Sequence, residues 1–252
     1  MNLNKFVGSS FPNGIWFRSE RFSSLVLEEC IENGEIKERV YYNGNSRELN
    51  PLEYFSKMNM AIILVLSLLI RVAFFVMIYR YLSTVDYSGL MTIFLGLEML
   101  LAAHNISNWI MQIIIFWCFP EGRSLRKFHG AEHKVINAYN CFNSLPTYDL
   151  VKSISPYSEN CASRITPIKT IVSIAKVLII IKLGKSLHFI LLLVAVVFVG
   201  YVLSHLIIKS KVDMIFQWIY VGKPTERELE VAYTGMKNLK AAEEEYYNAC
   251  HG

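Results

Sequence analysis

The chain has 252 residues, of which 53% are hydrophobic and 18% are charged. Soluble domains are about 45–50% apolar and about 25% charged, so this composition is typical of a membrane protein. The 25 lysines and arginines and 21 acidic residues give a formal net charge of +4, which is too small to indicate nucleic acid as a partner. The five cysteines have no regular spacing, which argues against a disulfide framework. The expected partner is therefore the lipid bilayer.

The polar N-terminal segment, residues 1–57, is expected to form a small cytoplasmic β-hairpin element. Two short runs rich in β-branched and aromatic residues, 24–30 and 36–42, flank the dipeptide Asn33-Gly34. Asn-Gly is the strongest short hairpin signal, because both central positions of the turn take positive φ. A third strand is expected at residues 15–17.

Two long apolar segments, 60–82 and 89–119, predict a first membrane helical hairpin over residues 58–119. At about 1.5 Å rise per residue, each segment is long enough to cross a hydrocarbon core of about 30 Å. Arg71 lies near the middle of the first segment, where a charge is costly. Two interpretations stay open: Arg71 pairs with Glu98, or the second helix is longer than the membrane and its polar stretch lies in polar surroundings.

Two further apolar segments predict a second membrane hairpin over residues 168–208. The segment 187–208 is long enough for a full span. The segment 168–181 is shorter and contains two lysines, so a short span, a tilted span and a re-entrant segment all stay open.

The last segment, residues 209–252, is expected to be a cytoplasmic amphipathic helix. Thr225 and Glu228 have the spacing of a capping box, which marks the start of that helix. The predicted fold class is therefore mainly α, a polytopic membrane protein with about four membrane helices, an N-terminal β-hairpin element and a C-terminal helix.

An even number of spans puts both termini on one side of the membrane. The loop 120–167 is basic, and by the positive-inside rule it faces the cytoplasm; its basic residues are Arg123, Arg126, Lys127, Lys134, Lys152 and Arg164. We therefore expect a multi-pass protein of the cell membrane with cytoplasmic N- and C-termini.

The strongest chemical signal is the motif His-Gly-Ala-Glu-His at residues 129–133, within the loop 120–167. On a helix, His129 and His133 are one turn apart, so both imidazoles can reach one ion, and neutral imidazoles suit zinc or a similar divalent metal. Glu132 is close enough to act as the general base for metal-bound water. The same string occurs in inverzincin proteases, with which the chain shares nothing else. A purely structural role of the two histidines stays open.

A catalytic divalent ion usually takes a third protein ligand in addition to two imidazoles. The candidates for this ligand are Glu159 and Cys161 in the segment Ser-Glu-Asn-Cys, and Glu230 on the C-terminal helix.

The stretch FHGAEHKVINAY resembles the signature of the YqhQ-like family, bacterial membrane proteins of unknown function that are described as predicted metal-dependent enzymes. The segment 13–18 is similar to the family's Glu-Gly-Val-Met-Met-Arg, and the segment 158–163 to its His-Pro-Arg-Cys-Gly-Thr. Near the end of the chain, Gln217, Pro224 and the segment 229–232 resemble the family's closing Gln, Pro and Leu-Glu-Val-Ala.

Three positions depart from the family's pattern: Asn13 stands where the family has Glu, Ser158 where it has His, and Ala162 where it has Gly. The residues that carry over are His129, Glu132, His133, Cys161 and Glu230. The resemblance implies a metal-dependent enzyme and no particular substrate.

Together these features favour a membrane-embedded, metal-dependent hydrolase at the cytoplasmic face. Glu132 is its expected catalytic residue and zinc its expected metal, with ligands from His129, His133, Cys161 and Glu230. Two alternatives stay open. One is a non-catalytic scaffold or regulatory protein that acts in a homo-oligomer or with a membrane protein partner. The other is a small transporter, because Arg71, Glu98 and His104 lie within membrane segments.

Overall fold

The structure is a computed structural model, and it describes residues 6–19, 21–27, 39–42, 56–87, 89–158, 161–184, 188–209 and 211–251. The chain divides into two compact units, each built from segments that are distant in the sequence. The first unit consists of Met1–Lys57, Phe116–Ser158 and Trp218–Gly252, and the second of Met58–Ile115 and Glu159–Gln217.

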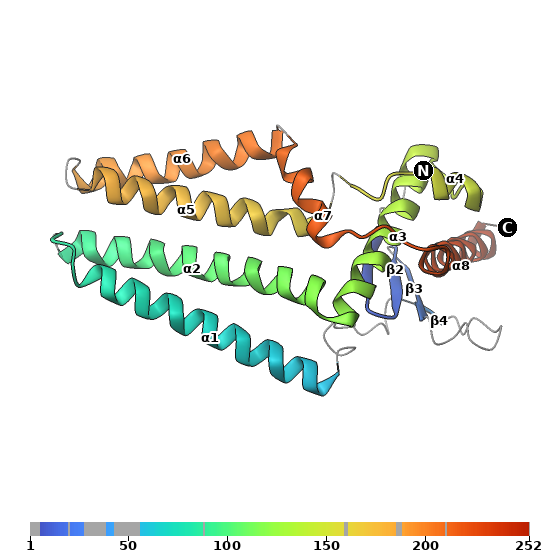
Figure 1. Cartoon of the computed structure of the whole chain (residues 1–252). Coiled ribbons are helices and arrows are strands. Elements are labelled where there is room, and N and C mark those ends of the chain that lie inside the picture. Colours follow the sequence, from blue (N-terminus) through green and yellow to red (C-terminus); the bar gives the residue numbers. More distant parts are fainter. Residues whose placement is uncertain are drawn as a thin grey trace. The chain divides into compact units, whose positions relative to one another are not determined.

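The first unit contains an antiparallel sheet in the order β1-β2-β3-β4 (Figure 1). Its strands are β1 (Val7–Phe11), β2 (Gly14–Arg18), β3 (Phe22–Leu27) and β4 (Arg39–Tyr42). In the register, Val7 pairs with Arg18, Gly14 with Leu27, and Phe22 with Tyr42.

Pairing of β3 with β4 confirms the predicted hairpin, and β2 confirms the third strand expected at residues 15–17. The predicted turn at Asn33-Gly34 lies outside the described residues. The sequence analysis missed β1, which pairs with β2 across the two-residue turn at Pro12 and Asn13.

Three helices complete the first unit: α3 (Pro120–Phe142), α4 (Tyr148–Ser153) and α8 (Glu226–His251). Helix α3 begins with a proline, whose fixed φ suits the first turn, and ends at Asn143, which takes the left-handed φ of 53°. The loop predicted over residues 120–167 therefore contains a helix of 23 residues. At the start of α8, the Thr225 backbone N–H donates to Glu228 Oε2 at 2.7 Å, as the predicted capping box requires.

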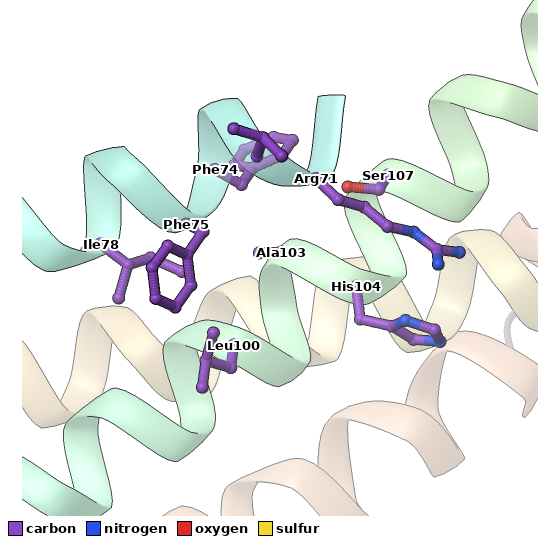
Figure 2. A pocket seen from close by; sticks show the side chains of 9 residues that line it. Arg71, Phe74, Phe75, Ile78, Leu100, Ala103, His104 and Ser107 are labelled. Carbon is purple, nitrogen blue, oxygen red and sulfur yellow. The ribbon is translucent and has the colours of Figure 1, made fainter. Parts of the chain in front are cut away.

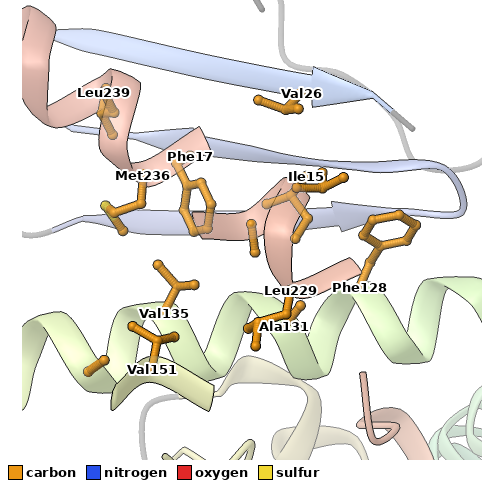
Figure 3. Close-up of a cluster of buried hydrophobic side chains, with 13 residues drawn as sticks. Ile15, Phe17, Val26, Phe128, Ala131, Val135, Val151, Leu229, Met236 and Leu239 are labelled. Atoms are coloured by element: carbon orange, nitrogen blue, oxygen red, sulfur yellow. The ribbon is translucent and has the colours of Figure 1, made fainter. Parts of the chain in front are cut away.

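The core of the first unit lies between the sheet, α3 and α8 (Figure 3). Fully burying one large apolar side chain contributes about 1.5–3 kcal/mol, so this cluster is the main stabilising element of the unit. Its largest members come from all three elements: Ile15, Phe17, Val26, Phe128, Val135, Leu229, Met236 and Leu239.

The second unit is helical (Figure 1). Its helices are α1 (Lys57–Leu82), α2 (Gly89–Cys118), η4 (Ala162–Arg164), α5 (Ile165–Leu183), α6 (Phe189–Lys209), η5 (Val212–Phe216) and α7 (Gln217–Tyr220), of which α1, α2 and α7 extend into segments of the first unit. Among the described residues, α1, α2 and α6 are long and apolar enough to cross a membrane. These three helices match the predicted spans at 60–82, 89–119 and 187–208.

Helix α5 is not among these three candidate spans. It packs along α6, and its sequence contains Lys169, Lys176 and Lys182. The structure therefore identifies a mainly helical membrane protein with three candidate spans and a small N-terminal antiparallel sheet.

The predicted ion pair between Arg71 and Glu98 is wrong. Arg71 Nη2 donates to Asn108 Oδ1 at 3.3 Å, and Glu98 Oε1 lies 3.5 Å from Lys176 Nζ on α5. The reason is geometric, because Arg71 borders a cavity with Leu100 and residues further along α2, whereas Glu98 turns towards α5.

Candidate metal centre

Helix α3 carries the His-Gly-Ala-Glu-His motif in the interior of the first unit. His133 is 4% exposed and Glu132 is 6% exposed. The rings of His129 and His133 lie edge to face with their centroids 4.4 Å apart, as expected for side chains one helical turn apart. The two imidazoles are therefore neighbours in a mostly buried position.

A backbone carbonyl holds the His133 ring. Nδ1 of His133 bonds to the Pro156 carbonyl oxygen at 2.7 Å. Because a carbonyl only accepts, Nδ1 carries the proton, and Nε2 presents the lone pair.

The segment that carries this carbonyl is itself fixed to α3. Asn137 Nδ2 donates to the carbonyls of Ser155 and Tyr157 at 3.1 and 2.8 Å. Lys134 Nζ donates to the carbonyl of Lys152 at 2.8 Å and also to that of Ile154. The Pro156 carbonyl is therefore held in place by hydrogen bonds from α3 to the residues before and after it in the chain.

The His129 ring also bonds to a backbone carbonyl, that of Tyr220. The glycine of the motif allows this approach: a Cβ at Gly130 would lie 2.0 Å from the Gly222 carbonyl oxygen. In addition, the Gly222 N–H donates to the Arg126 carbonyl at 2.8 Å. Only a glycine at position 130 therefore lets the segment around Gly222 lie against α3.

Both imidazoles are neutral near pH 7. Burial and the neighbouring His133 together lower the pKa of His129 to about 3, against the effect of the Tyr220 carbonyl. Burial also lowers the pKa of His133, which its bond to the Pro156 carbonyl only partly offsets. Neutral imidazole is the form that binds metal ions.

Glu132 lies against strand β1 of the sheet. Ser10 Oγ donates a hydrogen bond to Glu132 Oε2. A Cβ at Gly8 would lie 2.6 Å from Glu132 Oε1, so the absence of a side chain there makes room for the carboxylate. Burial raises the pKa of Glu132 to about 7, and the Ser10 hydrogen bond acts in the opposite direction. This carboxyl group can therefore exchange a proton near neutral pH.

The other predicted ligands come from outside helix α3. Glu230 is exposed on α8, and it contributes, after burial and Glu226, to the raised pKa of Tyr148. Cys161 belongs to the second unit and is 7% exposed, with Sγ 2.8 Å from Ser163 Oγ. Glu159 lies outside the described residues. The ligand roles of Cys161 and Glu230 stay predictions.

Sequence reasoning missed three partners of the motif: the Ser10 hydroxyl and the carbonyls of Pro156 and Tyr220. Ser10 is separated from Glu132 by 122 positions, and no local pattern connects the two. Backbone carbonyls exist at every position, so they leave no signal in the sequence.

The fold and the site define a class: a helical membrane protein with a compact unit in which two neighbouring histidines lie beside a buried carboxyl group. The family model described as "Protein of unknown function (DUF1385)" matches residues 26–242. The chain belongs to this family, in agreement with the YqhQ-like motifs of the sequence. Comparison with curated proteins and with solved structures gives no match. The family description specifies no reaction, so the function must be argued from the site.

Proposed function

We propose that the chain is a membrane-embedded, metal-dependent hydrolase in which His129 and His133 bind a divalent ion, most readily zinc. One observation supports this proposal above all. Each imidazole is neutral and has one ring nitrogen bonded to a backbone carbonyl. Metal-ligating histidines almost always have such a partner, which fixes the tautomer and directs the other nitrogen towards the ion.

Cys161 is the third ligand in this proposal, on the basis of the sequence resemblance. Thiolate and imidazole together form a donor set that zinc prefers. Cys161 follows Pro156 by five positions, so chain length alone keeps their Cα atoms within about 18 Å of one another. Ser158 replaces the histidine of the family pattern, which leaves a coordination position for water.

A divalent ion in this position would lower the pKa of a bound water. The residues of the chain supply the proton transfer. The Glu132 carboxyl group has a pKa near 7, and Ser10 holds its Oε2 atom. Glu132 is therefore suited to take a proton as a general base at neutral pH.

We further propose that the chain crosses the membrane four times, with α5 as the fourth membrane-spanning helix. Within the helix, Lys176 is paired with Glu98, and Lys169 and Lys182 lie near the two ends, from which lysines can reach the interface. The guanidinium of Arg126 lies 3.9 Å from the ring centroid of Trp117, and such aromatic residues are typical of the membrane–water interface. Four spans put both termini and the motif on the cytoplasmic side.

This topology is tested by cysteine labelling of intact cells with a membrane-impermeant reagent. Ser153→Cys and Lys237→Cys, both at exposed positions, are expected to remain unlabelled. Thr84→Cys, exposed in the turn between α1 and α2, is expected to react. Labelling of Ser153→Cys or Lys237→Cys in sealed cells contradicts the cytoplasmic placement.

The metal proposal is tested by elemental analysis of the detergent-purified full chain. Wild-type protein is expected to contain about one equivalent of zinc or another transition metal, and His129→Ala and His133→Ala are expected to lose it. His188→Ala is the control, because His188 is exposed and precedes α6, and it should retain the metal. Metal-free wild type, or metal retained in both motif variants, contradicts the proposal.

The second candidate function is a non-catalytic scaffold, in a homo-oligomer or with a membrane protein partner. It is favoured by the fact that the bonds of His129 and His133 also tie α3 to the segments around Tyr220 and Pro156. For a scaffold, we expect metal-free wild-type protein and a lowered unfolding temperature for His129→Ala.

A further inference from the structure

The second unit contains a cavity of about 330 Å³ between α1 and α2 (Figure 2). Its volume falls in the range of small-molecule sites, about 300–1,000 Å³. One part of its wall is apolar, with Phe74, Phe75, Ile78 and Leu100. The other part is polar, with Arg71, His104 and Ser107. The wall of the cavity is therefore mainly apolar, and Arg71, His104 and Ser107 are its polar side chains.

The polar groups of this cavity are hydrogen-bond donors. Asn108 accepts from Arg71 at 3.3 Å through Oδ1, so its Nδ2 group donates to His104 Nε2 at 2.9 Å. Because His104 Nε2 accepts, the ring proton of a neutral His104 lies on Nδ1. Ser107 is 1% exposed, and its buried hydroxyl has no hydrogen-bond partner among the described residues. A buried hydroxyl without a partner costs about 1–3 kcal/mol, and a ligand can recover that cost.

Arg71 supplies a positive charge in the middle of α1, which is one of the candidate membrane spans. Its guanidinium has five N–H donors, and a hydrogen bond to the neutral Asn108 is its only interaction among the described residues. No carboxylate lines the cavity. An arginine in the middle of a membrane span is costly unless it is paired, so the cavity favours an anion.

We propose that this cavity binds an anionic amphiphile, a molecule with one long hydrocarbon chain and a phosphate or carboxylate head. The head accepts hydrogen bonds from Arg71, His104 and Ser107, and the chain lies along the phenylalanines and Leu100. Arg71 and His104 are exposed, so the ligand can enter sideways from the lipid phase. The site lies within the second unit and does not depend on the metal centre.

The test is equilibrium binding to the purified full chain in a non-ionic detergent with three radiolabelled probes. Oleate, oleoyl lysophosphatidate and monoolein carry the same acyl chain and differ in the head, which is a carboxylate, a phosphate or neutral. We expect at least one anionic probe to bind about tenfold or more tightly than monoolein, because charge-assisted hydrogen bonds are the strong ones. The anionic probe that binds more tightly identifies the head as phosphate or carboxylate.

Variants assign the binding to the cavity. Arg71→Gln is expected to reduce the affinity for the anionic probe to that for monoolein, and Ser107→Ala to reduce it about threefold through the loss of one hydrogen bond. Arg80→Gln removes an exposed arginine near the end of the same helix and should bind as wild type does. Equal binding of the three probes, or wild-type affinity in Arg71→Gln, overturns the proposal. If Arg71→Gln does not fold, two other variants are measured in its place. They are Arg71→Lys, which keeps the charge but loses the forked guanidinium donors, and Ser107→Ala. Wild-type affinity for the anionic probe in both variants overturns the proposal.

Discussion

The two units of the molecule use the same apolar residue types in opposite ways. In the first unit, Phe17, Phe128 and Met236 are fully buried between the sheet and two helices. In the second unit, α1 buries only Ile63 and Ile78 of its 26 residues. An apolar side chain gains nothing from burial when its surroundings are lipid, so the exposed surface of α1 is the expected state of a membrane helix.

The two units also differ in how they accommodate buried polar groups. In the first unit, the buried His133 and Glu132 bond to a carbonyl and to a hydroxyl, and they do so as neutral or titratable groups. In the second unit, the partly buried charges of Glu98 and Lys176 face each other. We conclude that the first unit shifts the pKa values of the single groups His129, Glu132 and His133, whereas the second unit pairs the partly buried charges of Glu98 and Lys176. Three predictions test this distinction.

The largest effect is expected for Gly130→Ala in the first unit. A Cβ at this position would lie 2.0 Å from the Gly222 carbonyl oxygen, and that backbone cannot move without losing its bond to the Arg126 carbonyl. Overpacking costs about 1–3 kcal/mol and more against fixed backbone. We expect little folded protein and a strongly lowered unfolding temperature in a thermal melt.

The matched control is Gly89→Ala at the start of α2 in the second unit. A Cβ there meets nothing within 4 Å, so the substitution should be neutral or slightly stabilising. Equal melting temperatures for Gly130→Ala and wild type would show that the segment around Gly222 does not pack on α3 as described.

The next effect is expected for Lys176→Met in the second unit. Lys176 and Glu98 have side chains that are 22% and 14% exposed, and the variant leaves the carboxylate without its partner. Removing one member of a buried pair costs about 3 kcal/mol. The double variant Lys176→Met with Glu98→Gln should recover most of the loss, since neither charge remains. Lys169→Met, at an exposed position of the same helix, is the control, and strictly additive losses in the cycle contradict the pairing.

The smallest effect is the pH dependence of the metal-free protein. The folded pKa of His129 is about 3 and that of His133 is also lowered, so below pH 6.5 the unfolded chain takes up protons that the folded chain does not, and stability falls. The folded pKa of Glu132 is about 7, so between pH 7 and 4.5 the folded chain takes up one extra proton and gains stability. Because two histidines oppose one carboxyl group, the net effect of acidification below pH 6.5 is a loss of stability.

Two variants separate these contributions in melts recorded from pH 7 to 5. His129→Gln removes one of the two opposing groups, so the melting temperature should change less with pH. Glu132→Gln removes the compensating group, so the loss on acidification should become steeper. Identical slopes for both variants and wild type are incompatible with buried, neutral imidazoles.

Much of the fold was predictable because its signals are local. The lengths of the apolar runs gave three spans to within a few residues, and Thr225 with Glu228 gave the start of α8. The 23-residue length of α3 was not predicted, although Pro120 marks its first turn. The reason is that many polar residues separate the buried Phe128 and Val135 from the other apolar residues of the helix, so its apolar face is not obvious in the sequence.

Less of the site was predictable, because its contacts are long-range. The spacing of His129 and His133 predicted neighbouring rings, and the rings are neighbours. The pairing of Arg71 with Glu98 was wrong, since a sequence gives the depth of a charge in the membrane and not the direction it faces. The contact of Glu132 with Ser10 depends on how β1 docks on α3, which no local pattern encodes.

The central claim, a metal held by the histidine pair, is tested most directly by X-ray absorption at the zinc edge on the purified full chain. The account predicts two imidazole nitrogens at about 2.0 Å and one sulfur at about 2.3 Å from the ion. It also predicts that Cys161→Ser removes the sulfur shell and leaves the nitrogens. A spectrum without imidazole scattering, or one unchanged by His129→Ala, would contradict the account.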